Sequence, residues 1–107
     1  MNKMETWTQE AVMSHVRRAA DIHKRLKSAS RNETRYCLRV MRWLNWVEPN
    51  DQQILWLRAG GVPWETISER FQKGRGSLER EETIALIGIA AGLNRLGVDP
   101  EDPSLNV

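Results

Sequence analysis

Apolar residues near the start of the chain recur at steps of three and four, the spacing of one helix face. Between residues 8 and 27 this stripe consists of Val12, Val16, Ala19, His23 and Leu26. The spacing predicts a first helix with one buried side, and Thr6 or Thr8 can cap its N-terminus. Because His23 lies on the apolar stripe and no further ligand stands at suitable spacing, we expect a core histidine rather than a metal ligand.

A second helix is predicted after a break at residues 28–32 and extends to about Val47. Ser30 and Glu33 have the spacing of a capping box, in which each side chain accepts a hydrogen bond from the other residue's backbone N–H. The apolar positions that follow are Cys37, Val40, Leu44 and Val47. They repeat the pattern of the first helix, so residues 8–47 form an N-terminal helical pair.

Glycine and proline divide the next segment into two shorter helices. Pro49 ends the second helix, and Asn50 can cap a third that runs over residues 51–59. The pair Gly60-Gly61 closes it, because a glycine readily adopts the left-handed conformation common at helix ends. Pro63 suits the first turn of a fourth helix. The inward-facing candidates of these two helices are Ile54, Leu55, Leu57, Trp64, Ile67 and Phe71.

A fifth helix is predicted to follow a short connection from Gln72 to Gly74 or Gly76 and to end near Leu96, and it is apolar on two sides. One side carries Leu78, Ile84, Ile87 and Ala91. The other carries Leu86, Ile89, Leu93 and Leu96. A helix of this kind is either central to the core or shared between subunits. The acidic tail, residues 97–107, contains two prolines and is expected to be flexible and not helical.

The composition limits the classes of protein that the chain can represent. Its 107 residues, 40% hydrophobic and 28% charged, fit one folded domain. The single Cys37 excludes an internal disulfide and a multi-thiolate metal site. No N-terminal leader is evident, and the longest apolar run is about half a membrane span, so we expect a cytoplasmic protein without a membrane partner. No nucleophile–base pair, phosphate loop or carboxylate dyad is evident, so we expect no catalysis, cofactor or metal.

The net charge of +2 conceals a strong asymmetry between the two halves of the chain. Residues 1–48 hold ten Lys and Arg against five Asp and Glu, whereas residues 49–107 hold six against nine. Phosphates, or an acidic partner, would therefore bind the N-terminal half. The candidate contacts there are Arg17, Arg18, Lys24, Arg25, Arg35, Arg39 and Arg42. The last three recur at steps of four and three and form a basic ridge on the second helix.

The segment from residue 43 to residue 94 carries several distinctive motifs: Trp43-Leu44-x-Trp46 before Pro49, Trp56-Leu57-Arg58-Ala59, Pro63-Trp64-x-x-Ile67 and Ala90-x-x-Leu93-Asn94. A short amphipathic helix between two others is the layout of a helix-turn-helix, whose last helix can enter the major groove of DNA. The motifs resemble the DNA-binding domain of sigma factors, and more closely an uncharacterised helix-turn-helix family of phages and proteobacteria. The resemblance covers most of the chain, and it implies a phage or phage-derived gene, such as one for a small terminase subunit.

The predicted recognition helix departs from that family pattern. Its turn has the sequence Gln72-Lys73-Gly74-Arg75-Gly76-Ser77, and the helix begins Leu78-Glu79-Arg80-Glu81-Glu82. Three glutamates repel the phosphate backbone, so sequence-specific recognition by this helix is expected to be weakened or lost. The contacts that remain available on it are Lys73, Arg75, Ser77 and Arg80.

These observations predict a single all-α domain of about five helices: a basic helical pair (8–47), a helix-turn-helix unit (51–96) and an acidic tail (97–107). The leading functional hypothesis is weak or non-specific DNA binding by a homo-oligomer with a small-terminase-like role in packaging. In this role the tail would dock onto the large terminase subunit. One alternative is a sigma-like transcriptional regulator, and another is a protein-interaction adaptor that does not bind DNA.

Overall fold

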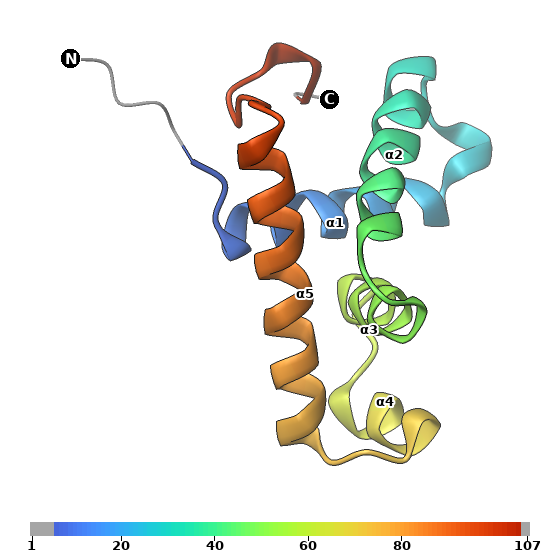
Figure 1. Cartoon of the computed structure of the whole chain (residues 1–107). Helices are drawn as coiled ribbons and strands as arrows, with labels where there is room; N and C mark the ends of the chain where they lie inside the picture. Colours follow the sequence, from blue (N-terminus) through green and yellow to red (C-terminus); the bar gives the residue numbers. More distant parts are fainter. Residues whose placement is uncertain (1–5, 106–107) are drawn as a thin grey trace.

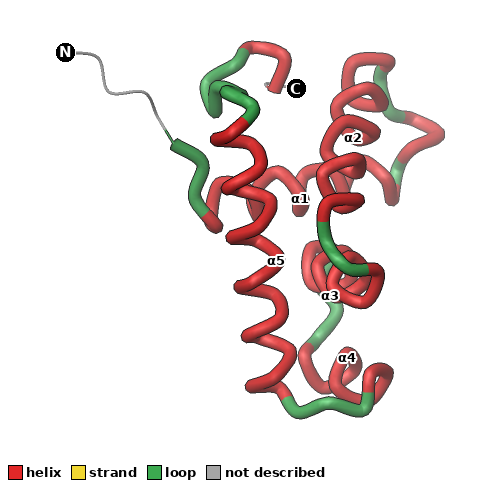
Figure 2. Tube along the Cα trace, in the orientation of Figure 1, coloured by secondary structure: helices red, strands yellow, loops and turns green. Residues whose placement is uncertain are grey.

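The computed structural model describes residues 6–105, and this range contains helices and loops but no strand (Figure 2). Five α-helices follow one another: α1 (Gln9–Lys24), α2 (Arg31–Trp43), α3 (Pro49–Ala59), α4 (Trp64–Phe71) and α5 (Arg75–Arg95). Three short 3-10 turns accompany them: η1 (Leu26–Ser28), η2 (Leu44–Trp46) and η3 (Pro103–Leu105). The expected all-α fold of about five helices is confirmed.

The long helix α5 runs along the whole molecule, and α1 crosses behind both α5 and α2 (Figure 1). The shorter helices α3 and α4 lie below α2 beside the first half of α5 (Figure 1). The domain is flat, with principal extents of 45 × 38 × 18 Å. Helix α1 packs against α2, α3 and α5, and its contact with α2 is the most extensive between any two helices of the described chain.

The first two helices begin with the cap chemistry that the sequence predicts, and the third does not. Thr8 caps α1 by accepting a hydrogen bond from the backbone N–H of Ala11, and the predicted capping box of Ser30 and Glu33 is complete in α2. Asn50, however, is not the cap of α3. This helix begins at Pro49, two residues earlier than predicted, with Glu48 at the cap position, because proline fits the first helical position, where its missing N–H is not needed.

The main core lies where α1, α2, α3 and α5 meet, and Val12, Val16 and Ala19 occupy it as predicted. The expectation for His23 is wrong, because this side chain is exposed and meets the ring of Trp56 edge-on with 5.6 Å between centroids. Helix α1 ends at Lys24, so its last buried position falls on Ile22 and the stripe does not continue to His23.

A second, smaller core joins α3, α4 and the first turns of α5. It consists of the buried residues Ile54, Trp64, Ile67 and Leu78, with Leu57, Val62 and Phe71 packed around them. Gly61, with a φ of +86°, turns the chain between α3 and α4, as the Gly60-Gly61 pair predicted. Three consecutive helices therefore surround a core of their own at the lower end of the molecule.

The two apolar sides of α5 differ in their surroundings. Leu86, Ile89 and Leu93 are buried in the main core. On the other side only Leu78 is buried, whereas Ile84 and Ile87 are 59% and 49% exposed. The second apolar side is therefore not covered within residues 6–105.

The tail differs from the expectation of a flexible segment without helix. Residues Pro103–Leu105 form a 3-10 turn, and Leu105 is buried in the main core. The side chains of Asp99 and Asp102 accept backbone hydrogen bonds from residues two positions later, which closes the turns that bring Leu105 back. Asn106 and Val107, which also belong to the predicted tail, lie outside the described residues.

Two glycines one helical turn apart in α5 give a matched test of this packing. A Cβ added at Gly88 would meet nothing within 4 Å, whereas one at Gly92 would lie 3.0 Å from the ring of Trp46. We expect Gly88→Ala to raise the free energy of unfolding by about 0.5–1 kcal/mol, because alanine loses less backbone entropy in a helix. Gly92→Ala should raise the free energy of unfolding by less, since the ring of Trp46 must move to make room for the added Cβ. Urea denaturation of both variants measures the difference, and the reverse ranking would contradict the placement of Trp46.

Candidate nucleic-acid interface

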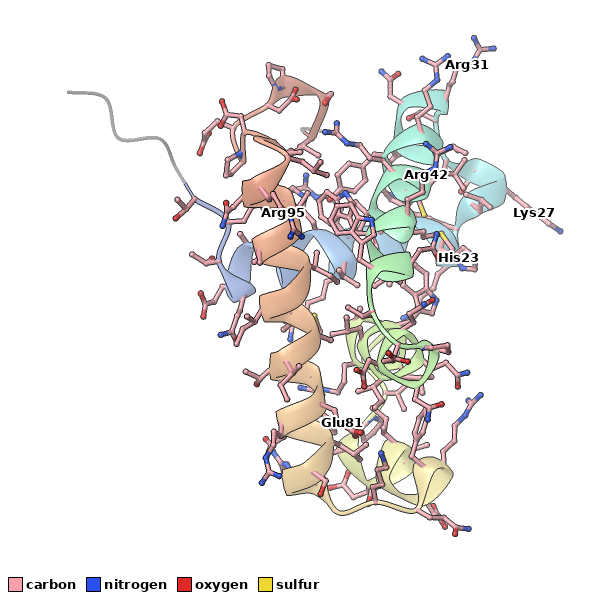
Figure 3. The ribbon with its side chains drawn as sticks, in the orientation of Figure 1. His23, Lys27, Arg31, Arg42, Glu81 and Arg95 are labelled. Carbon is pink, nitrogen blue, oxygen red and sulfur yellow. The ribbon has the colours of Figure 1, made fainter. Side chains whose placement is uncertain are left out.

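The outward face of α2 carries three exposed arginines in line. Arg31, Arg35 and Arg42 recur at helical spacing, so they lie within one narrow sector of the helix surface. Figure 3 shows Arg31 and Arg42 on the side of α2 that faces away from α5. None of the three forms an ion pair with a carboxylate of residues 6–105. Sequence reasoning overlooked Arg31, although its position four residues before Arg35 was the signal that could have identified it.

Arg39, the middle member of the predicted ridge, takes part in an internal contact. It donates a hydrogen bond to the hydroxyl of Ser104 and lies 4.0 Å from the carboxylate of Asp102. It therefore fastens the tail to α2. The ridge of Arg35, Arg39 and Arg42 is not a single surface, and Arg31 replaces Arg39 in the line of outward cations.

The predicted cations of α1 also divide into bound and outward-facing groups. Arg25 lies 2.7 Å from Glu33 and 3.6 Å from Asp21, and its hydrogen bond to Glu33 lowers the pKa of that carboxyl to about 2. Lys24 donates from Nζ to the carbonyl oxygen of Gly60 at 2.8 Å and so ties α1 to the end of α3. Arg17 and Arg18 are exposed, and the guanidinium of Arg18 lies 6.0 Å from the ring centroid of Tyr36.

In the segment predicted to be a helix-turn-helix, two of the three glutamates of α5 face inward. Glu81 pairs with Lys73 at 2.6 Å, and Figure 3 shows it on the side of α5 that faces α3 and α4. Glu82 lies 3.4 Å from Arg58, whose guanidinium in turn stacks 4.2 Å from the ring centroid of Trp64. These pairs hold the three helices together, so Lys73 has a structural contact in addition to its predicted role.

The inward direction of these glutamates changes the expected surface of α5. The side chains of Glu81 and Glu82 are only 28% and 17% exposed, whereas that of Glu79 is 50% exposed and pairs with Arg75. The premise that three glutamates face the phosphates is therefore wrong. Ser77 and Arg80 are exposed at the start of the helix, and neither is paired with a carboxylate within residues 6–105.

An aromatic cluster fills the space between α2 and α5 above α1. Trp7 donates from its indole N–H to the carbonyl oxygen of Val98 at 2.8 Å and contacts the rings of His15 and Trp43. The Nδ1 atom of His15 lies 2.5 Å from the hydroxyl of Tyr36. Burial, followed by the charges of Arg18 and Arg39, lowers the pKa of His15. Sequence reasoning placed the core histidine at His23, whereas the half-buried histidine is His15.

The described part of the chain meets neither of two simple requirements, a cluster of metal-ligating side chains and a helix able to span a membrane. Residues 6–105 contain no group of three or more His, Cys, Asp or Glu side chains placed to hold a metal ion. Over the same range, no helix has the length and apolar character needed to cross a membrane.

The environment of His15 predicts a pH dependence of stability. Because the folded protein holds the pKa of His15 below its ordinary value of 6.5, the unfolded chain takes up the proton first as the pH falls. Stability should therefore be complete above about pH 6.5 and be lost as the pH falls through the folded pKa. His15→Asn should flatten this dependence in melting curves between pH 7 and pH 5. The exposed His23→Asn is the matched control, and an equal flattening by both variants would contradict the assignment.

Comparison with known proteins gives a family but no activity. No curated protein and no solved structure matches the chain. The resemblance to sigma factors and terminases therefore stays a prediction from the motifs. A family model matches residues 2–89, most of the chain, and the chain belongs to this family, the Domain of unknown function (DUF6362).

Proposed function

We propose that this protein binds DNA without catalysis, mainly through phosphate contacts along α2. The observation that carries the proposal is the line of Arg31, Arg35 and Arg42, exposed and without a carboxylate partner in the described range. By contrast Arg25, Arg39, Lys73 and Arg75 all contact carboxylates of the same chain. Other exposed cations without such a partner within residues 6–105, Arg17, Arg80 and Arg95 among them, lie on α1 and α5, so α2 is distinguished by carrying three in one line.

The dimensions of this line suit a nucleic-acid backbone. Arg31 and Arg42 are separated by about 16 Å along the axis at the rise of an α-helix, and a DNA strand places a phosphate every 3.4 Å or so of its axis. Several phosphates thus lie within reach of the three side chains. Arginine–phosphate contacts fix position but carry no base information, so binding through α2 should be weak in sequence preference. A small-terminase-like packaging role fits such binding.

A second candidate is sequence-specific binding by the start of α5, as in a sigma-like regulator. The observation in its favour is the exposed pair Ser77 and Arg80, which is not screened by Glu81 and Glu82 because both glutamates face inward. An arginine at the start of a recognition helix can contact guanine in the major groove. The two candidates use different helices, so substitutions can separate them.

A salt titration of DNA affinity tests the leading proposal. The logarithm of the binding constant should fall linearly with the logarithm of the salt concentration. Each phosphate neutralised by the protein should add about 0.9 to the steepness of that slope. The triple change Arg31→Gln, Arg35→Gln and Arg42→Gln should reduce that slope by about 2–3. The matched control, Arg75→Gln with Arg80→Gln, should leave the slope close to the wild-type value. Fluorescence anisotropy with a labelled duplex of mixed sequence measures the salt dependence of affinity for the wild-type protein and for both variants.

The outcomes separate the candidates. The regulator is favoured by two results together. The double change on α5 must lower DNA affinity more than the triple change on α2 does, and unrelated competitor DNA must fail to displace the protein from a preferred sequence. If no binding is detected even at low salt, both DNA proposals fail, and the adaptor that binds an acidic protein partner is the alternative that remains.

The packaging role also predicts self-association. A small-terminase-like protein acts as an oligomer, so light scattering at micromolar concentration should give a mass that is a multiple of 12.4 kDa. A strict monomer, with or without a DNA duplex, would contradict this role while leaving DNA binding itself intact. Docking of the tail onto a large subunit stays a prediction, and the exposed Asp99 and Glu101 would make the contact, because Leu105 is buried in the protein's own core.

A further inference from the structure

The solvent-facing side of α5 carries a continuous apolar strip in the middle of the helix. Ile84, Ile87, Gly88 and Ala91 are all exposed, and their spacing places them on one side of the helix. No charged residue of α5 interrupts this strip over two turns, and Glu10 of α1 lines a hollow along its edge with Ile87 and Ala91. Single exposed apolar residues are common on protein surfaces, but a strip of neighbours is typical of a binding surface.

A hollow of about 300 Å³ adjoins the strip at its C-terminal end. It is lined by Trp46, Gly88, Gly92, Arg95 and Leu96. The hollow exists because the two glycines lack side chains and Trp46 forms a wall beside them, its ring 3.0 Å from where a Cβ of Gly92 would lie. A space of this kind can take one large apolar side chain of a partner.

Each end of the strip carries a cation. Arg80 precedes Ile84, and Arg95 follows Ala91, so the two are about 22 Å apart along the axis at the helical rise. Both are exposed, and neither forms an ion pair with a carboxylate of residues 6–105. Along α5, the apolar strip and its hollow therefore lie between two cations, Arg80 and Arg95.

We propose that this face of α5 binds an amphipathic helix of another protein that is apolar in its centre and acidic at both ends. The partner's central side chains would cover Ile84 and Ile87, one would enter the hollow beside Trp46, and its carboxylates would pair with Arg80 and Arg95. This surface is distinct from the arginines of α2, so the inference goes beyond the proposed DNA binding and does not depend on it.

Two other occupants fit the face less well. A second copy packed along the same strip places arginines against arginines: Arg80 meets Arg95 in the antiparallel direction, and like residues meet in the parallel one. Like charges in such contact oppose association. A DNA strand would place phosphates against two isoleucines over about two turns, with cations only at the ends. An acid-ended helix alone complements both the apolar and the charged parts.

A designed peptide tests the proposal with the full-length protein. The probe is a fluorescein-labelled helical peptide of about 20 residues, with leucines along one face and two glutamates near each end. Its matched control carries lysines in place of those glutamates. Fluorescence anisotropy should show that the glutamate peptide binds at least ten times more tightly than the lysine peptide.

Variants of the chain then locate the binding surface. Ile87→Asp and Gly88→Leu should each weaken binding of the glutamate peptide at least tenfold, and circular dichroism melting should show that both remain folded, since these positions are exposed. Arg80→Gln with Arg95→Gln should remove the preference between the two peptides. The matched control Arg35→Gln, on α2, should change neither affinity.

Three results would overturn the proposal. The first is equal binding of both peptides by the wild-type protein, and the second is no binding of either. The third is self-association that Ile87→Asp abolishes, which would assign the face to a second copy. Because these measurements contain no DNA, their failure is distinguishable from failure of DNA binding through α2.

Discussion

Helix α1 packs one face against α2, α3 and α5, and its side chains Val12, Val16 and Ala19 are fully buried there. Burying a valine contributes about 1.5–3 kcal/mol, so this one helix supplies much of the apolar contact that unites the domain. It also sets the positions of α2 and α5, which diverge above it and leave room for the aromatic cluster (Figure 1). The outward directions of α2 and α5, on which both proposed surfaces depend, follow from packing against α1.

Carboxylates of the chain decide which cations are structural and which are available. Glu33 holds Arg25, Asp102 holds Arg39, and Glu81 holds Lys73. These pairs lie at the surface and stabilise the fold only modestly, but they occupy guanidinium and ammonium groups that a phosphate would otherwise contact. A count of basic residues in the sequence therefore overestimates the binding surface. Only the basic residues that the tertiary structure leaves without a carboxylate partner are available to bind phosphates.

Local chemistry predicted the helices well and the tertiary contacts poorly. The capping box of Ser30 and Glu33, and the turn at Gly61, depend on neighbouring residues only, and both are present. The direction of Glu81 could not be predicted, because α5 is apolar on two sides and periodicity does not reveal which side is buried. The contact of Arg39 with Ser104 and the burial of Leu105 join segments far apart in the sequence, so no local pattern encodes them.

The rotation of α5 about its axis determines both the charge at the start of this helix and the exposure of its apolar strip. With Leu86, Ile89 and Leu93 directed into the core, Glu82 must face Arg58 of α3, and Ile84 and Ile87 must face solvent. The same rotation that removes acidic charge from the start of the helix therefore exposes the apolar strip farther along it. A rotation that covered the isoleucines would expose core leucines instead. The strip is thus a direct consequence of how the domain is packed, and it remains available while the arginines of α2 are occupied.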